Sequence, residues 1–224
     1  LFLDSQVEPT VEEQVKLYSE VFEVMAGKKV VIRTLDAGSD KPVPYINAIH
    51  EENPALGVRG WRLTRTSDAV LNRQLEALAK ASAGKDVKLW VMAPMVITAG
   101  EANAFARAAK VHGIRNIGIM VEVPELVAEL ADALEQIDFV SIGTNDLSQY
   151  TLGKNRHGVG SDISDARDPR VLELISRVLE VAKTRSIPVG VCGEAAADPE
   201  SAKLFVSLGV NSLSASPALI PGLR

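Results

Sequence analysis

Short apolar runs alternate with longer segments of helical periodicity along the chain, and this alternation restricts the fold more than any other feature. The expected strands cover residues 29–34, 56–60, 88–95, 116–124, 138–146, 187–194 and 211–217. The expected helices cover residues 9–27, 68–82, 101–113, 125–136, 169–185 and 198–209. The strand segments are almost continuously apolar, which is typical of parallel strands covered on both faces. The alternation therefore predicts right-handed βαβ units in an α/β protein.

Local signals support individual helices. Thr10 and Glu13 have the spacing of a capping box at the start of the first helix. A long loop is expected between residues 146 and 169. The helix that follows carries one apolar stripe, made of Val171, Leu174, Ile175, Val178 and Ala182.

The number and order of the units favour a (β/α)8 barrel of the TIM type. The first expected helix has no strand before it, and seven strands follow. This pattern indicates an eight-stranded barrel that lacks its first strand, and its last helix can also be absent. An open doubly wound sheet is the alternative, although no G-x-G-x-x-G loop supports it. We expect residues 1–224 to form one barrel domain. Because the chain starts at Leu1 within an apolar run, we expect it to be a fragment of a longer multidomain protein.

Charge and cysteine content exclude several classes of partner. The net charge is −5 and no block of Lys and Arg is present, so nucleic acid is not an expected partner. The chain has no apolar run long enough to span a membrane and no basic segment before its apolar start, so neither membrane insertion nor a signal peptide is predicted. A single cysteine rules out an intrachain disulfide and fits a reducing, cytoplasmic setting.

Polar residues at the ends of the expected strands carry the functional signal. In a barrel, catalytic groups lie at the C-terminal ends of the strands. The residues at these ends are Arg33, Arg59, Glu122, Asn145, Asp146, Cys192 and Glu194. Two arginines can bind a phosphate or a carboxylate with forked hydrogen bonds. Two carboxylates suit Mg²⁺, which completes its shell with substrate oxygens and water. The pattern therefore predicts a Mg²⁺-dependent site for a small phosphorylated acid, with Asp146 as metal ligand, Asn145 as substrate contact and Arg156 reaching the anion from the loop beyond.

Each residue also has a purely structural interpretation. A strand-end arginine such as Arg33 can be a surface ion-pair residue. Glu122, flanked by apolar residues, can be a metal ligand or half of a buried ion pair. Cys192 can be an inert, buried small residue. The three histidines lie outside any metal-ligand or catalytic spacing. The functional interpretation depends on the joint occurrence of these groups at one end of the strands.

Several motifs resemble a known family, the C-terminal phosphoenolpyruvate-binding domain of Enzyme I of the bacterial sugar phosphotransferase system. They are RTLDAGSDKPVPY (33–45), EENPALGVRGWR (51–62), MVEVP (120–124), DFVSIGTNDLSQYTLGKNR (138–156) and GVCGEAAADP (190–199). The resemblance covers almost the whole chain. The stretch 138–156 is similar to that of pyruvate phosphate dikinase and phosphoenolpyruvate synthase as well, whereas RTLDAGSDKPVPY followed by NPALGVRG favours Enzyme I.

The resemblance implies a homodimeric barrel and a role for each site residue. Arg33, Arg59 and Lys41 would bind the phosphate of phosphoenolpyruvate. Glu122 and Asp146 would hold Mg²⁺, while Asn145 and Arg156 would position the substrate, Arg156 at its carboxylate. Cys192 would be the general acid that protonates the methylene carbon, and Glu194 would support both the cysteine and the mouth of the substrate-binding site.

The resemblance also implies partners outside this chain. The activity is that of a phosphoenolpyruvate–protein phosphotransferase, which releases pyruvate. The phosphoryl acceptor in the family is a histidine on a separate N-terminal domain, and the carrier protein HPr receives the group next. None of the histidines here lies in such a context, so we expect this chain alone to be incomplete. The family's first strand ends in a further phosphate-binding arginine, and the chain starts just after that point.

Three other functions remain open at this level. The barrel of a dikinase or synthase would send the phosphoryl group on to a nucleotide. A non-catalytic module would serve dimerisation or sensing, but the motif positions are intact. An aldolase or lyase of a related barrel superfamily would use Glu122 and Asp146 for an enolate, but would leave the arginines and Cys192 without a role.

Overall fold

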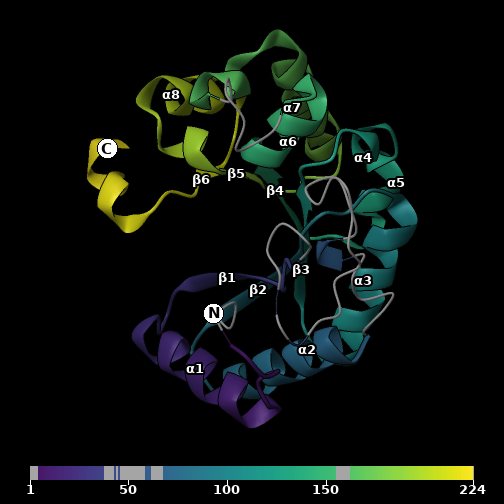
Figure 1. Ribbon diagram of the computed structural model, residues 1–224, viewed down its shortest axis with the longest axis vertical. Helices are drawn as coiled ribbons and strands as arrows, with labels where there is room; N and C mark the ends of the chain where they lie inside the picture. Colours follow the sequence, from purple (N-terminus) through teal and green to yellow (C-terminus); the bar gives the residue numbers. More distant parts are fainter. Residues whose placement is uncertain are drawn as a thin grey trace. The chain divides into compact units, whose positions relative to one another are not determined.

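Among the residues that the structure describes, six strands follow one another across the sheet in chain order (Figure 1). The computed structural model describes residues 5–37, 43, 45, 59–61, 68–154 and 162–223. Strictly sequential order is the order of a (β/α) barrel, whereas a doubly wound sheet reverses its order at a switch point. The α/β barrel-type fold is therefore confirmed, and the doubly wound alternative is excluded.

The chain divides into two compact units, and each is described by itself. The first contains Leu1–Met95 and Ala104–Ile117, and the second contains Val96–Asn103 and Gly118–Arg224. The first unit holds α1 (Val11–Val24), β1 (Lys29–Arg33), α2 (Asp68–Ser82) and β2 (Lys88–Ala93). The elements α3 (Ala99–Val111) and β3 (Asn116–Val121) cross the boundary between the units.

The second unit holds the remaining elements. Its helices are α4 (Glu125–Ala128), α5 (Leu130–Ala133), α6 (Thr144–Leu152), α7 (Pro169–Thr184) and α8 (Pro199–Leu208). Its strands after β3 are β4 (Phe139–Gly143), β5 (Val189–Cys192) and β6 (Ser212–Leu213). Short 3₁₀ segments are η3 (Leu134–Gln136), η4 (Ile163–Arg167), η5 (Glu194–Ala197) and η6 (Pro217–Leu223).

Packing in the first unit joins α1 and α2. Thr10 and Glu13 form the expected capping box, in which each side chain accepts from the other residue's backbone N–H. Tyr18 and Phe22 on α1 stack at 6.3 Å and are buried, as is Leu75 on α2. The strand β1 pairs with β2 in parallel, with Val31 opposite Trp90.

Parallel pairing also builds the second unit. Every residue of β4 is buried, which matches strands covered on both faces. The pairs β3–β4, β4–β5 and β5–β6 are all parallel. The apolar stripe predicted on α7 buries Val171, Ile175, Val178 and Ala182, while Leu174 is half-buried.

Three sequence-based expectations need correction. The expected strand at 56–60 lies largely outside the described residues, and its last two, Arg59 and Gly60, are not in a strand. The expected helix 125–136 is divided into α4, α5 and η3, because Glu129 leaves helical geometry and its carboxylate accepts from the Ala99 N–H at 2.9 Å. The loop expected after residue 146 was wrong for its first part, since α6 begins at Thr144 and ends at the left-handed Gly153.

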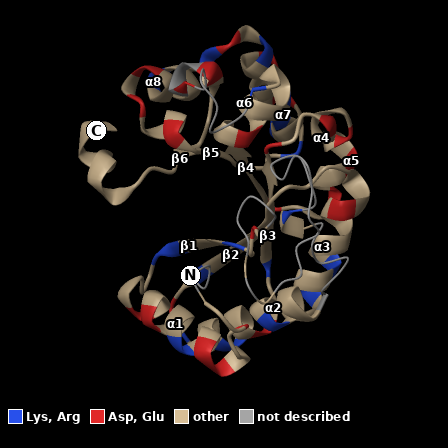
Figure 2. Cartoon of the chain, viewed as in Figure 1, with Lys and Arg blue, Asp and Glu red and all other residues tan. Residues whose placement is uncertain are grey.

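Charged residues of both signs are interspersed along the helices (Figure 2). Within the described part of the chain, none of the helices has the length and apolar character needed to cross a membrane.

Candidate functional site

The predicted site residues fall into two groups, one in each unit. Arg33 and Arg59 belong to the first unit. The second unit carries Glu122, Asn145, Asp146, Cys192 and Glu194. Lys41 and Arg156 lie outside the described residues.

The arginines of the first unit share one buried carboxylate. Arg59 donates from Nε and Nη2 to the two oxygens of Asp36, at 3.3 and 2.9 Å. Arg33, at the end of β1, places its Nη1 3.3 Å from Asp36 Oδ2. The side chains of Arg59 and Asp36 are each 1% exposed, whereas that of Arg33 is 37% exposed. We call these three residues the arginine clamp, in which Asp36 fixes the forked guanidinium of Arg59 by a bidentate contact.

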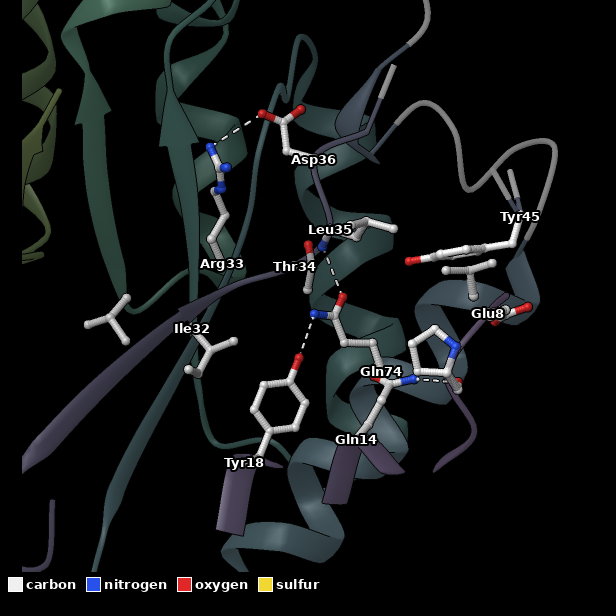
Figure 3. Close-up of a pocket in the computed structure, with 13 residues that line it drawn as sticks. Glu8, Gln14, Tyr18, Ile32, Arg33, Thr34, Leu35, Asp36, Tyr45 and Gln74 are labelled. Atoms are coloured by element: carbon white, nitrogen blue, oxygen red, sulfur yellow. Dashed lines mark hydrogen bonds and ion pairs between the residues drawn. The ribbon is translucent and has the colours of Figure 1, made fainter. Parts of the chain in front are cut away.

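The backbone between Arg33 and Asp36 is held by buried polar side chains (Figure 3). The Leu35 N–H donates to Gln74 Oε1, and Gln74 Nε2 donates to Tyr18 Oη, both at 2.9 Å. Burial raises the pKa of Tyr18 above its usual value, and the hydrogen bond from Gln74 opposes that rise. Tyr18 therefore stays neutral at physiological pH. This chain of contacts fixes the position of the clamp relative to α1 and α2.

A pocket of about 270 Å³ opens beside the clamp. Figure 3 shows Arg33 and Asp36 at one end of it and Tyr18, Gln14 and Gln74 along its wall. Burial and the nearby Glu8 carboxylate raise the pKa of Tyr45, which also lines the pocket. Among the described residues that line the pocket, the charged groups are the Arg33 guanidinium and the carboxylates of Glu8 and Asp36.

The two candidate carboxylates of the second unit are buried, and one of them lies over a glycine. Glu122 follows β3 and is 1% exposed, and Asp146, in the first turn of α6, is 6% exposed. A Cβ at Gly143 would lie 2.5 Å from Glu122 Oε2, so the carboxylate occupies the space above that glycine. Gly143 is the residue from which α6 starts. A side chain at 143 would collide with Glu122, so this arrangement depends on glycine.

Glu122 and Asp146 supply oxygen donors of the type that a magnesium ion takes. The residues that the structure describes contain no group of three or more His, Cys, Asp and Glu side chains with metal-binding spacing. Mg²⁺ usually takes one or two protein carboxylates and fills its remaining positions with water and substrate oxygens. Two buried carboxylates are compatible with that requirement.

Cys192 ends β5 and is held by residues of β4 and α6. Ser141 Oγ donates to Cys192 Sγ at 3.4 Å, and the thiol donates to the Ile142 carbonyl oxygen at 3.4 Å. Thr144 Oγ1 donates to the Cys192 carbonyl oxygen at 2.9 Å. The cysteine is half-buried. A thiol on a strand end with defined hydrogen bonds can act as a positioned acid or base.

Asn145 and Glu194 interact through the backbone. Asn145 Oδ1 accepts from the Glu194 N–H at 3.1 Å. The Glu194 side chain is exposed. Gly193 has φ +103°, and a Cβ there would collide with Thr144 Oγ1. The turn after Cys192 therefore depends on glycine.

Sequence reasoning missed three residues that contact the predicted ones. Asp36 lies only three positions after Arg33, but its second partner, Arg59, is 23 residues further along the chain. Ser141 precedes Asn145 in an apolar strand, where a serine is inconspicuous. Thr144 stands next to Asn145, and only the pairing of β4 with β5 brings it to Cys192.

The family model for "PEP-utilising enzyme, PEP-binding domain" matches residues 1–224. Among relatives, the phosphoenolpyruvate-protein phosphotransferase of Streptomyces coelicolor is 44% identical over 227 residues, which cover 100% of this chain and 41% of that protein. The phosphoenolpyruvate-protein phosphotransferase of Haloferax volcanii is 40% identical over 238 residues, covering 100% of this chain and 42% of that protein. The chain thus spans about two fifths of the length of these relatives.

Solved structures resemble the fold at low sequence identity. RipC from Yersinia pestis aligns with a TM-score of 0.54 and 12% identity, covering 99% of this chain and 84% of RipC. At this identity the likeness supports the fold alone.

Proposed function

Because the chain belongs to the family of phosphoenolpyruvate-binding domains of PEP-utilising enzymes, we propose that it is the substrate-binding part of a phosphoenolpyruvate–protein phosphotransferase, Enzyme I of a sugar phosphotransferase system. Relatives of that name at 44% and 40% identity favour this activity over the dikinase and the synthase. The family match over residues 1–224 supports a single functional domain. The structural observation that carries the proposal is the arginine clamp, since a buried guanidinium and a partly exposed one on the same carboxylate suit a multiply charged anion.

The clamp binds the phosphoryl group in this proposal. Phosphoryl transfer depends on positioning and on neutralising charge more than on covalent help from the protein. Arg33 and Arg59 offer fixed N–H donors, and Asp36 keeps the buried Arg59 paired before the substrate arrives. Lys41 would add a third cation on the phosphate side.

Glu122 and Asp146 would hold Mg²⁺. Both are buried, and Gly143 leaves the Glu122 carboxylate room beside the start of α6. When bound, the ion would supply further neutralisation of phosphoryl charge. Asn145 would contact the substrate, and Arg156 would bind its carboxylate. Glu194, whose N–H is bonded to Asn145, would keep that amide in place.

Cys192 would complete the reaction as general acid. As the P–O bond to the enol oxygen breaks, the phosphoryl group passes to a histidine of a separate domain, and the enolate of pyruvate is left. A proton from Cys192 Sγ then forms the new C–H bond at the methylene carbon, and its bonding pair stays on sulfur. A thiol with an ordinary pKa of about 8.5 is mostly protonated at neutral pH and can supply this proton.

The partners follow from the same proposal. The acceptor histidine would belong to an N-terminal domain of the longer protein, and HPr would receive the phosphoryl group from it. The relatives' greater length is compatible with such additional domains. We further propose that the protein is a cytoplasmic homodimer.

Calorimetric titration with phosphoenolpyruvate tests this function. We expect binding in excess Mg²⁺, no binding in EDTA, and affinity at least roughly tenfold weaker in Asp146→Asn, because removing a charged contact costs about 1.5–3 kcal/mol. The matched control is Asp132→Asn, an exposed carboxylate on α5, which should bind like the unmodified chain. No binding by the unmodified chain in Mg²⁺, or equal binding in EDTA, would overturn the proposal.

A further inference from the structure

The sulfur of Cys192 takes part in two hydrogen bonds, as acceptor in one and as donor in the other. Ser141 Oγ donates to Sγ, and Sγ donates to the Ile142 carbonyl oxygen, each at 3.4 Å. The bond to Ile142 needs the thiol proton. The bond from Ser141 becomes stronger when that proton has left, because a donor favours the charged form of its acceptor.

The strand register explains why Ser141 reaches the sulfur. In the parallel pair β4–β5, Ser141 lies opposite Gly190, and Gly143 lies opposite Cys192. Side chains two residues apart on a strand share a face, so Ser141 and Cys192 are diagonal neighbours on the same face. Gly190, the direct partner of Ser141, has no side chain to separate them.

The cysteine is also fixed at its backbone. Thr144 Oγ1 donates to the Cys192 carbonyl oxygen. Ser141 is 9% exposed, so its hydroxyl is largely removed from water and is directed to the sulfur. Backbone and side chain of Cys192 are thus held from the same neighbouring strand and the helix that follows it.

We propose that Ser141 is a positioning residue for Cys192, which orients the thiol and stabilises the negative charge that remains on sulfur after proton transfer. That this negative charge forms during turnover rests on the proposed function, in which the S–H bond breaks as the C–H bond of pyruvate forms. Water returns a proton to the sulfur before the next cycle. Ser141 itself keeps its proton throughout.

Alkylation of the thiol tests this role without any enzymatic assay. Cys192 is the only cysteine, so the rate constant for iodoacetamide reports on this sulfur alone. Because the thiolate is the reactive form, we expect Ser141→Ala to react roughly tenfold more slowly at neutral pH, in line with the loss of one hydrogen bond to a charged acceptor. Ser141→Thr, which keeps the hydroxyl, should restore most of the rate.

A matched control variant shows whether the change in alkylation rate is specific to Ser141, and the charged residues around Cys192 are the same in every variant. Ser212 on β6 lies opposite Gly190 on the other side of β5, and Ser212→Ala should leave the alkylation rate unchanged. The strands β4 and β6 carry no charged residue, η5 carries Glu194, and α6 carries Asp146; every variant keeps both carboxylates. Thermal unfolding of each variant checks that the fold is intact. Alkylation of Ser141→Ala at the unmodified rate would overturn the proposal.

A second measurement distinguishes failure of this inference from failure of the proposed function. Exchange of the methyl protons of pyruvate for deuterium, followed by NMR in D₂O with Mg²⁺, reports proton transfer at carbon. We expect Ser141→Ala to lower the maximal exchange rate while the pyruvate concentration at half-maximal rate stays unchanged. Exchange at the full rate in Ser141→Ala would contradict the positioning role. Absence of exchange in the unmodified chain would instead contradict the proposed function, and the alkylation rates would still decide the role of Ser141.

Discussion

At the scale of single residues, Asp36 determines whether the arginine clamp can exist. The Arg59 side chain is 1% exposed, and a buried guanidinium needs a partner because water no longer solvates its charge. Asp36 supplies both of its carboxylate oxygens to Arg59 and one of them also to Arg33. Removing one partner of a buried ion pair typically destabilises a protein by about 3–5 kcal/mol, because the other charge stays buried.

We therefore expect Asp36→Asn to lower the free energy of unfolding by roughly 3 kcal/mol. The substitution keeps the shape of the side chain but removes its charge, so the loss comes from the guanidinium of Arg59. Urea denaturation measures it, and Asp132→Asn, an exposed carboxylate on α5, serves as the control. Equal unfolding free energies for the two variants would show that Asp36 does not carry the charge balance of the clamp.

The candidate residues that were predictable from the sequence are those that lie at the ends of strands. Arg33 and Cys192 end strands in the structure, as expected. Asp36 and Ser141 were not predictable in the same way, because their partners Arg59 and Cys192 are distant in the sequence. The contact from Ser141 to Cys192 spans 51 residues and exists only in one register of β4 against β5. The assigned roles of these residues stay predictions.

At the scale of elements, local signals located most helices well. The expected and observed bounds of α2 agree residue for residue. α6 was missed because its sequence, TNDLSQYTL, lacks a clear apolar stripe, and its limits are set by Gly143 and Gly153 instead. The division of α4 from α5 depends on a tertiary contact, from Glu129 to Ala99, that no local signal reports.

Helix α7 offers a test of how a cap responds to pH. Asp168 caps its N-terminus, and hydrogen bonds from the Arg170 side chain and backbone lower the pKa of Asp168 from 3.8 to about 2. Because the folded-state pKa lies below the unfolded value, the stabilisation is fully present above pH 3.8 and is lost as the pH falls toward about 2.

We expect the melting temperature of the unmodified chain to exceed that of Asp168→Asn at neutral pH. Asparagine keeps a cap oxygen but cannot form the charged contact with Arg170. The difference between the two melting temperatures should shrink steadily below pH 3.8. Calorimetric scans at a series of pH values measure it, and a difference that does not change with pH would contradict the assignment.

At the scale of the whole molecule, the parallel strands in chain order identify the fold class. Continuous apolar strands alone predicted parallel pairing, but they could not separate a barrel from a doubly wound sheet, because both consist of βαβ units. The strand order makes that distinction.

A ligand that binds the folded chain and not the unfolded chain should stabilise the folded state. At a phosphoenolpyruvate concentration of about 100 times Kd, mass action adds about 2.7 kcal/mol. For a chain of this size, that corresponds to a rise in melting temperature of roughly 5–10 °C. We expect this rise in Mg²⁺, and its loss in EDTA and in Arg33→Ala. A rise of equal size in EDTA would argue against a metal-dependent site.

One contact within the second unit has a consequence for how this sequence can change over evolutionary time. Gly118 on β3 lies directly opposite Phe139 on β4, and the phenyl ring occupies the space where a side chain at 118 would stand. The two positions therefore share a single volume. A larger residue at 118 is compatible only with a smaller one at 139, so substitution of Gly118 alone is blocked. Among descendants of this chain, the two positions should therefore covary, so that a larger side chain at 118 is accompanied by a smaller side chain at 139.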